Sequence, residues 1–199
     1  MSDKPVRHWT LESQETLFSG FYQIDRLRFR HSLHQGGSTP ILDRELFLRG
    51  NVTGVLPYDP VTDQVALIEQ FRIGAMHQNP DPWLTEIIAG MIEPGEAPEE
   101  VAVRESKEEA GLTLDKVELI AHYLGSPGAT TEEVFIYYAE TDLSTAGGVY
   151  GLDQENEDIL VKIVSADEAI GMLDSRQVRN ALSIIALQWF RHRRVMQGA

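Results

Sequence analysis

The sequence predicts an α/β protein, an α+β fold in which a mixed sheet packs against helices. Two observations support this prediction. Short apolar segments of strand length recur along the chain and are separated by turn residues. Other segments, in the middle and at the end of the chain, place their apolar residues at helical spacing. A chain of 199 residues with 42% hydrophobic content is long enough for one medium domain and a small extra module.

Residues 1–49 are expected to form the extra module, a β-rich extension. The side chains of residues 16–33 alternate as they do in a strand, and the turn signal at residues 35–40 precedes a second strand at 41–50. By pattern alone, Phe21 is a residue in the core of the first strand. The remaining chain, residues 50–199, is expected to form the main domain.

The elements of the main domain follow in order. Strands are expected at 51–60 and 64–73, joined by a turn at 58–63 where Asp-Pro and Thr-Asp interrupt the pattern. Residues 84–90, LTEIIAG, lead into a glycine loop and a helix that stops at Gly111. Further strands are expected at 117–126, 133–141 and 159–164. Two helices complete the chain, a short one at 165–175 and an amphipathic one at 177–196.

The helix before Gly111 carries an unusual concentration of acid. Glu105 and Glu109 are one turn apart on the same helix face, Glu108 is close beside them, and Glu96 precedes the helix. Arg104 is the cation among these four carboxylates, so much of their repulsion requires an external cation. Oxygen ligands favour Mg²⁺ or Mn²⁺ over zinc. A solvated acidic helix is the alternative that composition alone would favour.

Charge and composition exclude several classes of function. The formal net charge of −14 repels nucleic acid and anionic membrane surfaces, so neither is an expected partner. The chain has no cysteine, which excludes disulfide and thiol chemistry. Residues 1–10 have no apolar signal core, and the longest apolar stretch, at 181–190, is too short to span a bilayer. These features predict a cytoplasmic protein.

Three segments outside the acidic helix could contribute to a site for an anionic ligand, two by contact and one through catalytic groups. Ser126, Pro127 and Gly128 form a rigid turn whose backbone amides could approach an anionic or ribosyl group, although a simple turn between strands has the same pattern. Residues 151–159 form a polar, acidic loop, of the kind that often carries catalytic groups but can also be merely solvated. Arg72 ends a strand, where its guanidinium could meet a diphosphate or form a surface ion pair.

The acidic helix and its loop together match a longer pattern, G-x5-E-x7-R-E-x2-E-E-x-G-L. In this pattern the chain resembles the Nudix hydrolases. One departure is Ser106, where the family usually has an aliphatic residue, and we expect Ser106 to face the packed side of the helix. The resemblance implies a Nudix αβα sandwich. The matching residues are Gly90, Glu96, Arg104, Glu105, Glu108, Glu109, Gly111 and Leu112.

The position of Pro127, fifteen residues after Leu112, is similar to that in the ADP-ribose pyrophosphatase branch of the family. The resemblance then implies roles for other residues. Glu155 would be the general base, with Arg104 orienting the carboxylates. The metal would be bound by Ala89 through its carbonyl and by the side chains of Glu105, Glu108, Glu109 and Glu157. The substrate would contact Phe21, Arg44, Glu45, Arg72, Ser126, Pro127, Gly128 and Glu132.

The activity implied by the resemblance is Mg²⁺-dependent hydrolysis of ADP-ribose to AMP and ribose 5-phosphate, with two or three ions per site and Mn²⁺ as an alternative. A homodimer is also implied, in which Phe21 serves the active site of the partner. Two other functions stay open. The substrate could be another nucleoside diphosphate sugar, such as GDP-mannose, or the domain could sense a nucleotide without turnover. The role of base could instead fall to Glu157, to Glu132 or to metal-bound hydroxide acting alone.

Overall fold

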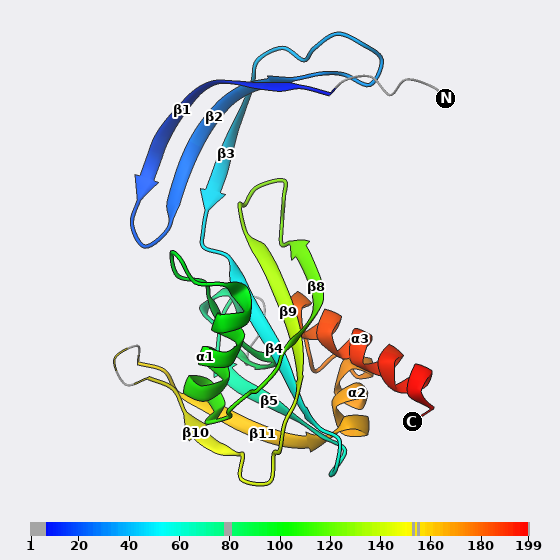
Figure 1. Cartoon of the computed structure of the whole chain (residues 1–199). Helices are drawn as coiled ribbons and strands as arrows, with labels where there is room; N and C mark the ends of the chain where they lie inside the picture. The colour runs from blue at the N-terminus through cyan, green and yellow to red at the C-terminus, as the bar shows by residue number, and fades with distance from the viewer. Residues whose placement is uncertain (1–6, 78–80, 153, 155, 199) are drawn as a thin grey trace. The chain divides into compact units, whose positions relative to one another are not determined.

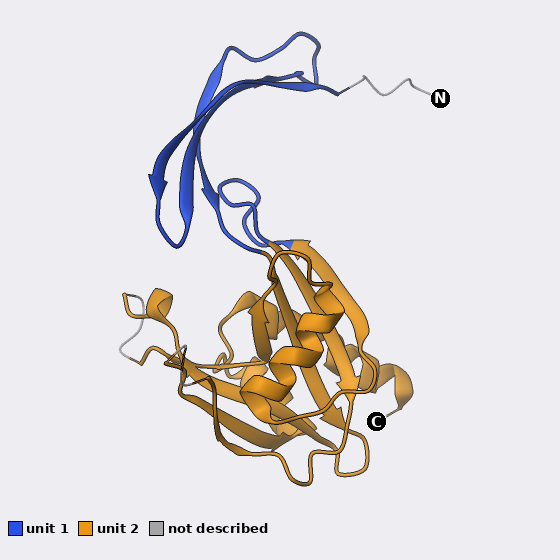
Figure 2. Ribbon diagram, turned by 60° about the vertical axis from the view of Figure 1, so that its left-hand side comes forward, with its two compact units in different colours: residues 1–50, 124–132 blue, residues 51–123, 133–199 orange. Residues whose placement is uncertain are grey.

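The computed structural model describes residues 7–77, 81–152, 154 and 156–198. It divides into two compact units, coloured separately in Figure 2. The first comprises residues 1–50 with 124–132, and the second comprises residues 51–123 with 133–199. Residues 124–132, which we expected in the main domain, belong to the first unit because Phe47 lies beside Thr130 and its amide donates to the Ala129 carbonyl at 2.8 Å.

The first unit contains an antiparallel sheet in the order β1-β2-β3, formed by β1 (Trp9–Ser19), β2 (Gln23–His31) and β3 (Leu42–Leu48). The expected single strand at 16–33 is wrong, because the chain turns back at residues 20–22 and residues 9–15 extend the first strand instead. Phe21 lies in this turn with 83% of its surface exposed, so it is not a core residue of a strand in this unit.

The second unit is built on a larger, mixed sheet. Its central order is β10-β11-β5-β4-β9-β8, with β6 paired to β5 and β7 paired to β4. Strands β4 and β9 run parallel, whereas β5 pairs antiparallel with β4, β6 and β11. The strands are β4 (Val52–Asp59), β5 (Gln64–Phe71), β6 (Trp83–Glu86), β7 (Ile88–Met91), β8 (Glu118–Leu124), β9 (Glu133–Glu140), β10 (Gly148–Tyr150) and β11 (Ile159–Ser165).

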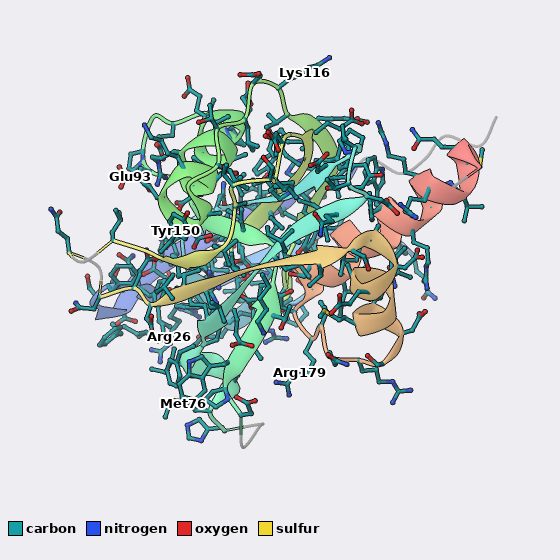
Figure 3. The ribbon with its side chains drawn as sticks, turned by 90° about the horizontal axis from the view of Figure 1, so that it is seen from below. Arg26, Met76, Glu93, Lys116, Tyr150 and Arg179 are labelled. Carbon is teal, nitrogen blue, oxygen red and sulfur yellow. The ribbon has the colours of Figure 1, made fainter. Side chains whose placement is uncertain are left out.

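Helices cover both faces of this sheet. One face packs against α1 (Pro98–Ala110), and the other packs against α2 (Ala166–Asp174) and α3 (Ala181–Gln197). Successive side chains of β5 point to opposite faces of the sheet and so contribute to two separate hydrophobic clusters. Val65 and Leu67 pack on the α2–α3 side, whereas Ala66 and Ile68 pack on the α1 side. Figure 1 shows the helices, and in Figure 3 Lys116 and Glu93 project on the α1 side of the sheet. The predicted α/β sandwich is confirmed.

Two details of the second unit differ from expectation. The last helix begins at Ala181 and not at residue 177, because Asn180 caps it by accepting a hydrogen bond from the Ser183 amide at 2.9 Å. Strands β6, β7 and β10 were not predicted, and their three or four residues are too few for a periodic signal. A short 3₁₀ turn, η1 (Ile73–Ala75), follows β5. Within the described residues, no helix combines the length and apolar character needed to cross a bilayer.

Candidate metal and diphosphate site

The helix α1 begins and ends where its sequence dictates. Pro98 occupies its first turn, and the Glu100 carboxylate accepts a hydrogen bond from the Ala97 amide at 3.1 Å. The helix ends at Gly111, whose φ of 66° is left-handed and allows its amide to bond the Lys107 carbonyl. Ser106 is buried, as expected, and its hydroxyl donates to the Ala102 carbonyl at 2.8 Å. These local bonds fix where α1 begins and ends.

Arg104 is the centre of an ion-pair network on α1. Its Nε donates to Glu96 at 3.0 Å, and its Nη1 donates to Glu105 at 2.8 Å and to Glu108 at 3.0 Å. The hydrogen bond with Glu96 is the main reason that the pKa of Arg104 is raised, and Arg104 in turn lowers the pKa of Glu96. One guanidinium therefore holds three of the four carboxylates of the motif.

Glu105 and Glu109 both lie over strand β7. The Ala89 amide donates to Glu109 Oε2 at 3.0 Å, and Glu109 is only 2% exposed. Gly90 lies so close to Glu105 that any Cβ at this position would collide with the Glu105 carboxylate. The glycine is therefore required for close approach of the carboxylate to the backbone. This arrangement confirms that the two side chains share one face of α1.

Burial makes both carboxylates difficult to ionise. It raises the pKa of Glu105 to about 7, although the charge of Arg104 opposes this effect. It raises the pKa of Glu109 to about 8, opposed by the Ala89 amide and increased by repulsion from Glu105. The charge of Glu157 raises the pKa of both groups further. Two acids that repel each other, one buried and one partly buried, are stabilised by protons or by a cation, and their all-oxygen donors fit a hard divalent ion.

The structure separates Glu108 from this pair. We expected three carboxylates to converge on one volume, but Glu108 is bound to Arg104, whereas Glu109 is bound to Ala89. Glu105 belongs to both sets, because it lies over Gly90 and also accepts from Arg104. Across the described part of the chain, no three acidic or histidine side chains already surround a common metal position.

Arg72 acts electrostatically on Glu109 and is held by a buried acid. Its Nε donates at 2.8 Å to Glu86, which is 3% exposed, and its positive charge lowers the pKa of Glu109. The second oxygen of Glu86 accepts from Asn180 Nδ2 at 2.7 Å. Sequence reasoning missed Glu86 and Asn180. The signal for Glu86 was a charged residue within the mostly apolar segment LTEIIAG.

The acidic loop between β10 and β11 reaches the same carboxylates through Glu157. Glu157 raises the pKa of both Glu105 and Glu109, and its own Oε2 accepts from the Leu152 amide at 3.2 Å. Glu155, the predicted general base, lies outside the described residues, so its role stays a prediction.

The other predicted substrate residues belong to the first unit. Phe21 makes an edge-to-face contact with Tyr22 at 4.7 Å between ring centroids. Arg44 and Glu45 are both exposed, and as successive residues of β3 their side chains alternate between the faces of the strand. These three assignments remain predictions.

The proline turn is also in the first unit. The Ser126 carbonyl accepts from the amides of Ala129 at 3.0 Å and Thr130 at 2.9 Å, which closes the turn that contains Pro127 and Gly128. Glu132 forms an ion pair with Arg49 at 3.1 Å. The expected contacts of this segment with substrate and metal likewise remain predictions.

Comparison with known proteins identifies the family. Residues 48–187, which contain the α1 carboxylates, the sheet of the second unit and the first part of α3, match the family model described as the NUDIX domain. The chain belongs to the NUDIX family. The predicted resemblance is therefore confirmed.

The relatives of this NUDIX chain include enzymes named for two different substrates. It is 47% identical over 177 residues to the ADP-ribose pyrophosphatase of Escherichia coli strain K12, a match that covers 89% of this chain and 85% of the relative. It is 32% identical over 148 residues to the GDP-mannose pyrophosphatase of Enterobacter sp. strain 638, covering 73% and 76% respectively. A solved structure titled "Crystal structure of ADP compounds hydrolase" shares the fold, with a TM-score of 0.69, 19% identity and 96% coverage of both chains.

Proposed function

We propose that this chain is an ADP-ribose pyrophosphatase that hydrolyses the diphosphate of ADP-ribose to AMP and ribose 5-phosphate. The observation that carries the proposal is the pair of Glu105, partly buried, and Glu109, buried, over β7, because two such acids that repel each other suit a bound cation. The similarity to the ADP-ribose pyrophosphatase of Escherichia coli supports the choice of substrate.

The cation in this proposal is Mg²⁺, with Mn²⁺ as an alternative and two or three ions per site. Glu105 and Glu109 would hold it, and Glu108, Glu157 and the Ala89 carbonyl are the further proposed ligands. A bound divalent ion of this kind neutralises the diphosphate and lowers the pKa of the attacking water. Arg104 orients the carboxylates through its three ion pairs, since it already fixes the side chains of Glu96, Glu105 and Glu108.

The protein groups then divide the remaining work. Glu155 accepts the proton of the attacking water as general base. As the water oxygen bonds to one phosphorus, the bridging P–O bond breaks and the second phosphate departs. Arg72 binds the diphosphate, because a guanidinium presents a planar set of donors suited to phosphate oxygens. Phe21, Arg44, Glu45 and the turn at Ser126, Pro127 and Gly128 are proposed to contact the rest of the substrate, together with Glu132.

A homodimer is the proposed assembly, in which Phe21 completes the partner's site. Every residue of β1 is exposed, and Trp9, Phe18 and Phe21 present large apolar surfaces on this small sheet. A module of about this size rarely supplies a sufficient core by itself, so a second copy would cover the exposed surface. The cytoplasmic location remains a prediction.

A panel of substrates tests the proposed function. The chain would be incubated with Mg²⁺ and ADP-ribose, GDP-mannose or other nucleoside diphosphate sugars, and the products would be identified by mass spectrometry. We expect ADP-ribose to have the highest kcat/KM and to release AMP. The Glu109→Gln variant, purified in parallel, controls for a contaminating hydrolase. A preference for GDP-mannose would make that compound the substrate in place of ADP-ribose. Binding of a nucleotide without turnover of any substrate would indicate a sensing domain.

A further inference from the structure

A buried carboxylate connects Arg72 to the beginning of α3. Glu86 is the last residue of β6, and both of its oxygens are engaged. Oε2 accepts from Arg72 Nε at 2.8 Å, and Oε1 accepts from Asn180 Nδ2 at 2.7 Å. Because Glu86 is almost fully buried, water cannot easily replace either partner. The carboxylate therefore holds a preferred orientation that both bonds determine.

Asn180 is itself fixed by the helix that it caps. Its Oδ1 accepts from the Ser183 amide at 2.9 Å, which leaves its Nδ2 directed to Glu86. Ser183 in turn accepts through its hydroxyl from the Ile87 amide at 2.8 Å, next to Glu86 in the chain. The start of α3 is thus bonded twice to the chain where β6 ends, at Glu86 and at Ile87. Both ends of the Asn180 amide are used.

This arrangement prepares Arg72 for an anion. The bond to Glu86 uses Nε, so the edge formed by Nη1 and Nη2 remains suited to two phosphate oxygens. An arginine side chain has many rotamers, and fixing it before the ligand arrives reduces the entropy lost on binding. The charge of Arg72 also lowers the pKa of Glu109, one of the proposed metal ligands.

We infer that Glu86 is a positioning residue for Arg72, and that Asn180, through Glu86, makes the start of α3 determine where the arginine meets the diphosphate. The inference rests on the proposed function, because it requires Arg72 to bind the substrate. It adds two residues, one on β6 and one before α3, to the groups that control substrate affinity.

Two variants test the two bonds separately. Glu86→Gln keeps the size of the side chain but places an amide NH₂ against one of two donors, so one of the two hydrogen bonds is lost. Asn180→Ser retains a residue suited to capping α3 but is too short to reach Glu86. Glu69→Gln is the matched control. Glu69 is on β5 and pairs with Lys162. It lies on the opposite side of the sheet from its neighbour Ile68, which is the register partner of Glu86.

Affinity is measured by calorimetry with the α,β-methylene analogue of ADP-ribose and Mg²⁺, alongside kcat and KM for ADP-ribose. We expect Glu86→Gln to raise Kd and KM about tenfold, the effect of losing one hydrogen bond to a charged group, with kcat changed less than about threefold. Asn180→Ser should raise both constants about threefold. Glu69→Gln should leave them within about twofold of wild type.

A double-mutant cycle separates positioning from general damage. In the Arg72→Ala background, Glu86→Gln should change Kd by less than about twofold, because the residue that it positions is gone. The inference is overturned if the tenfold effect persists in that background, or if Glu86→Gln binds like wild type. Should Glu86→Gln fail to fold, an Asn180→Ser variant with wild-type affinity overturns it as well. If the wild-type protein does not hydrolyse ADP-ribose, the proposed function is refuted instead. This outcome is distinct, because it is measured on the wild-type protein and not on the variants.

Discussion

Replacing Glu109 with glutamine should stabilise the metal-free protein at neutral and alkaline pH while removing its activity. The pKa of Glu109 is about 8 in the folded state, above its ordinary value of 4.5. Between these two values the folded protein holds a proton that the unfolded chain has released. The contribution of Glu109 to the unfolding free energy is therefore fully present below about pH 4.5. It is lost progressively as the pH rises through about 8. A glutamine at this position does not titrate, so that loss should disappear.

The size of the effect follows from the pKa difference. Each pH unit above the unfolded-state pKa costs about 1.4 kcal/mol of unfolding free energy, so at pH 7 the cost is on the order of 3 kcal/mol. Little solvent screening is expected, because Glu109 is 2% exposed. Glu105, with a pKa of about 7, titrates in the same range and is repelled by Glu109, so the two acids lose their protons as a coupled pair. Removing Glu109 should also make Glu105 easier to ionise.

Urea unfolding with EDTA from about pH 5 to 8.5 measures this difference. We expect the unfolding free energy of wild type to fall with pH by a few kcal/mol and that of Glu109→Gln to fall clearly less. Glu93→Gln, the same charge change at an exposed residue close to α1, should behave as wild type. Adding Mg²⁺ should stabilise wild type more than Glu109→Gln, and the variant's turnover should decrease by several orders of magnitude. Equal pH slopes would refute the burial argument, and near-normal activity at saturating Mg²⁺ would refute the metal site.

Three further predictions concern the base, the strand beneath the carboxylates and the assembly. Glu155→Gln should lower kcat roughly 10²–10⁴-fold with little change in KM; a loss below about threefold in steady-state assays would transfer the role to Glu157 or Glu132. Gly90→Ala should displace Glu105 and reduce Mg²⁺-dependent turnover while circular dichroism shows an intact fold, and full activity would contradict the close approach. Light scattering should give a dimer near twice 22.3 kDa, and both Phe21→Ala and deletion of residues 1–49 should weaken ADP-ribose binding; a fully active monomer at nanomolar concentration would exclude a shared site.

Local signals were sufficient for the motif helix. Gly111 marks its end, and helical spacing places Glu105 and Glu109 on one face, so the sequence and the structure agree there. The same kind of reasoning failed at residues 16–33. The side chains alternate on both sides of the turn at 20–22, and a period of two does not reveal that the chain reverses.

The sequence by itself determined the family, the α/β class, the acidic helix and the residues that carry its carboxylates, because each of these depends on residues close together in the chain. Only the tertiary structure decided how those carboxylates are divided, with Glu108 bound to Arg104 and Glu109 buried against Ala89. Only the structure revealed the bond between Glu86 and Asn180, which are 94 residues apart. Burial and long-range contact set the pKa of a carboxylate and the orientation of an arginine, and neither quantity is encoded in local periodicity.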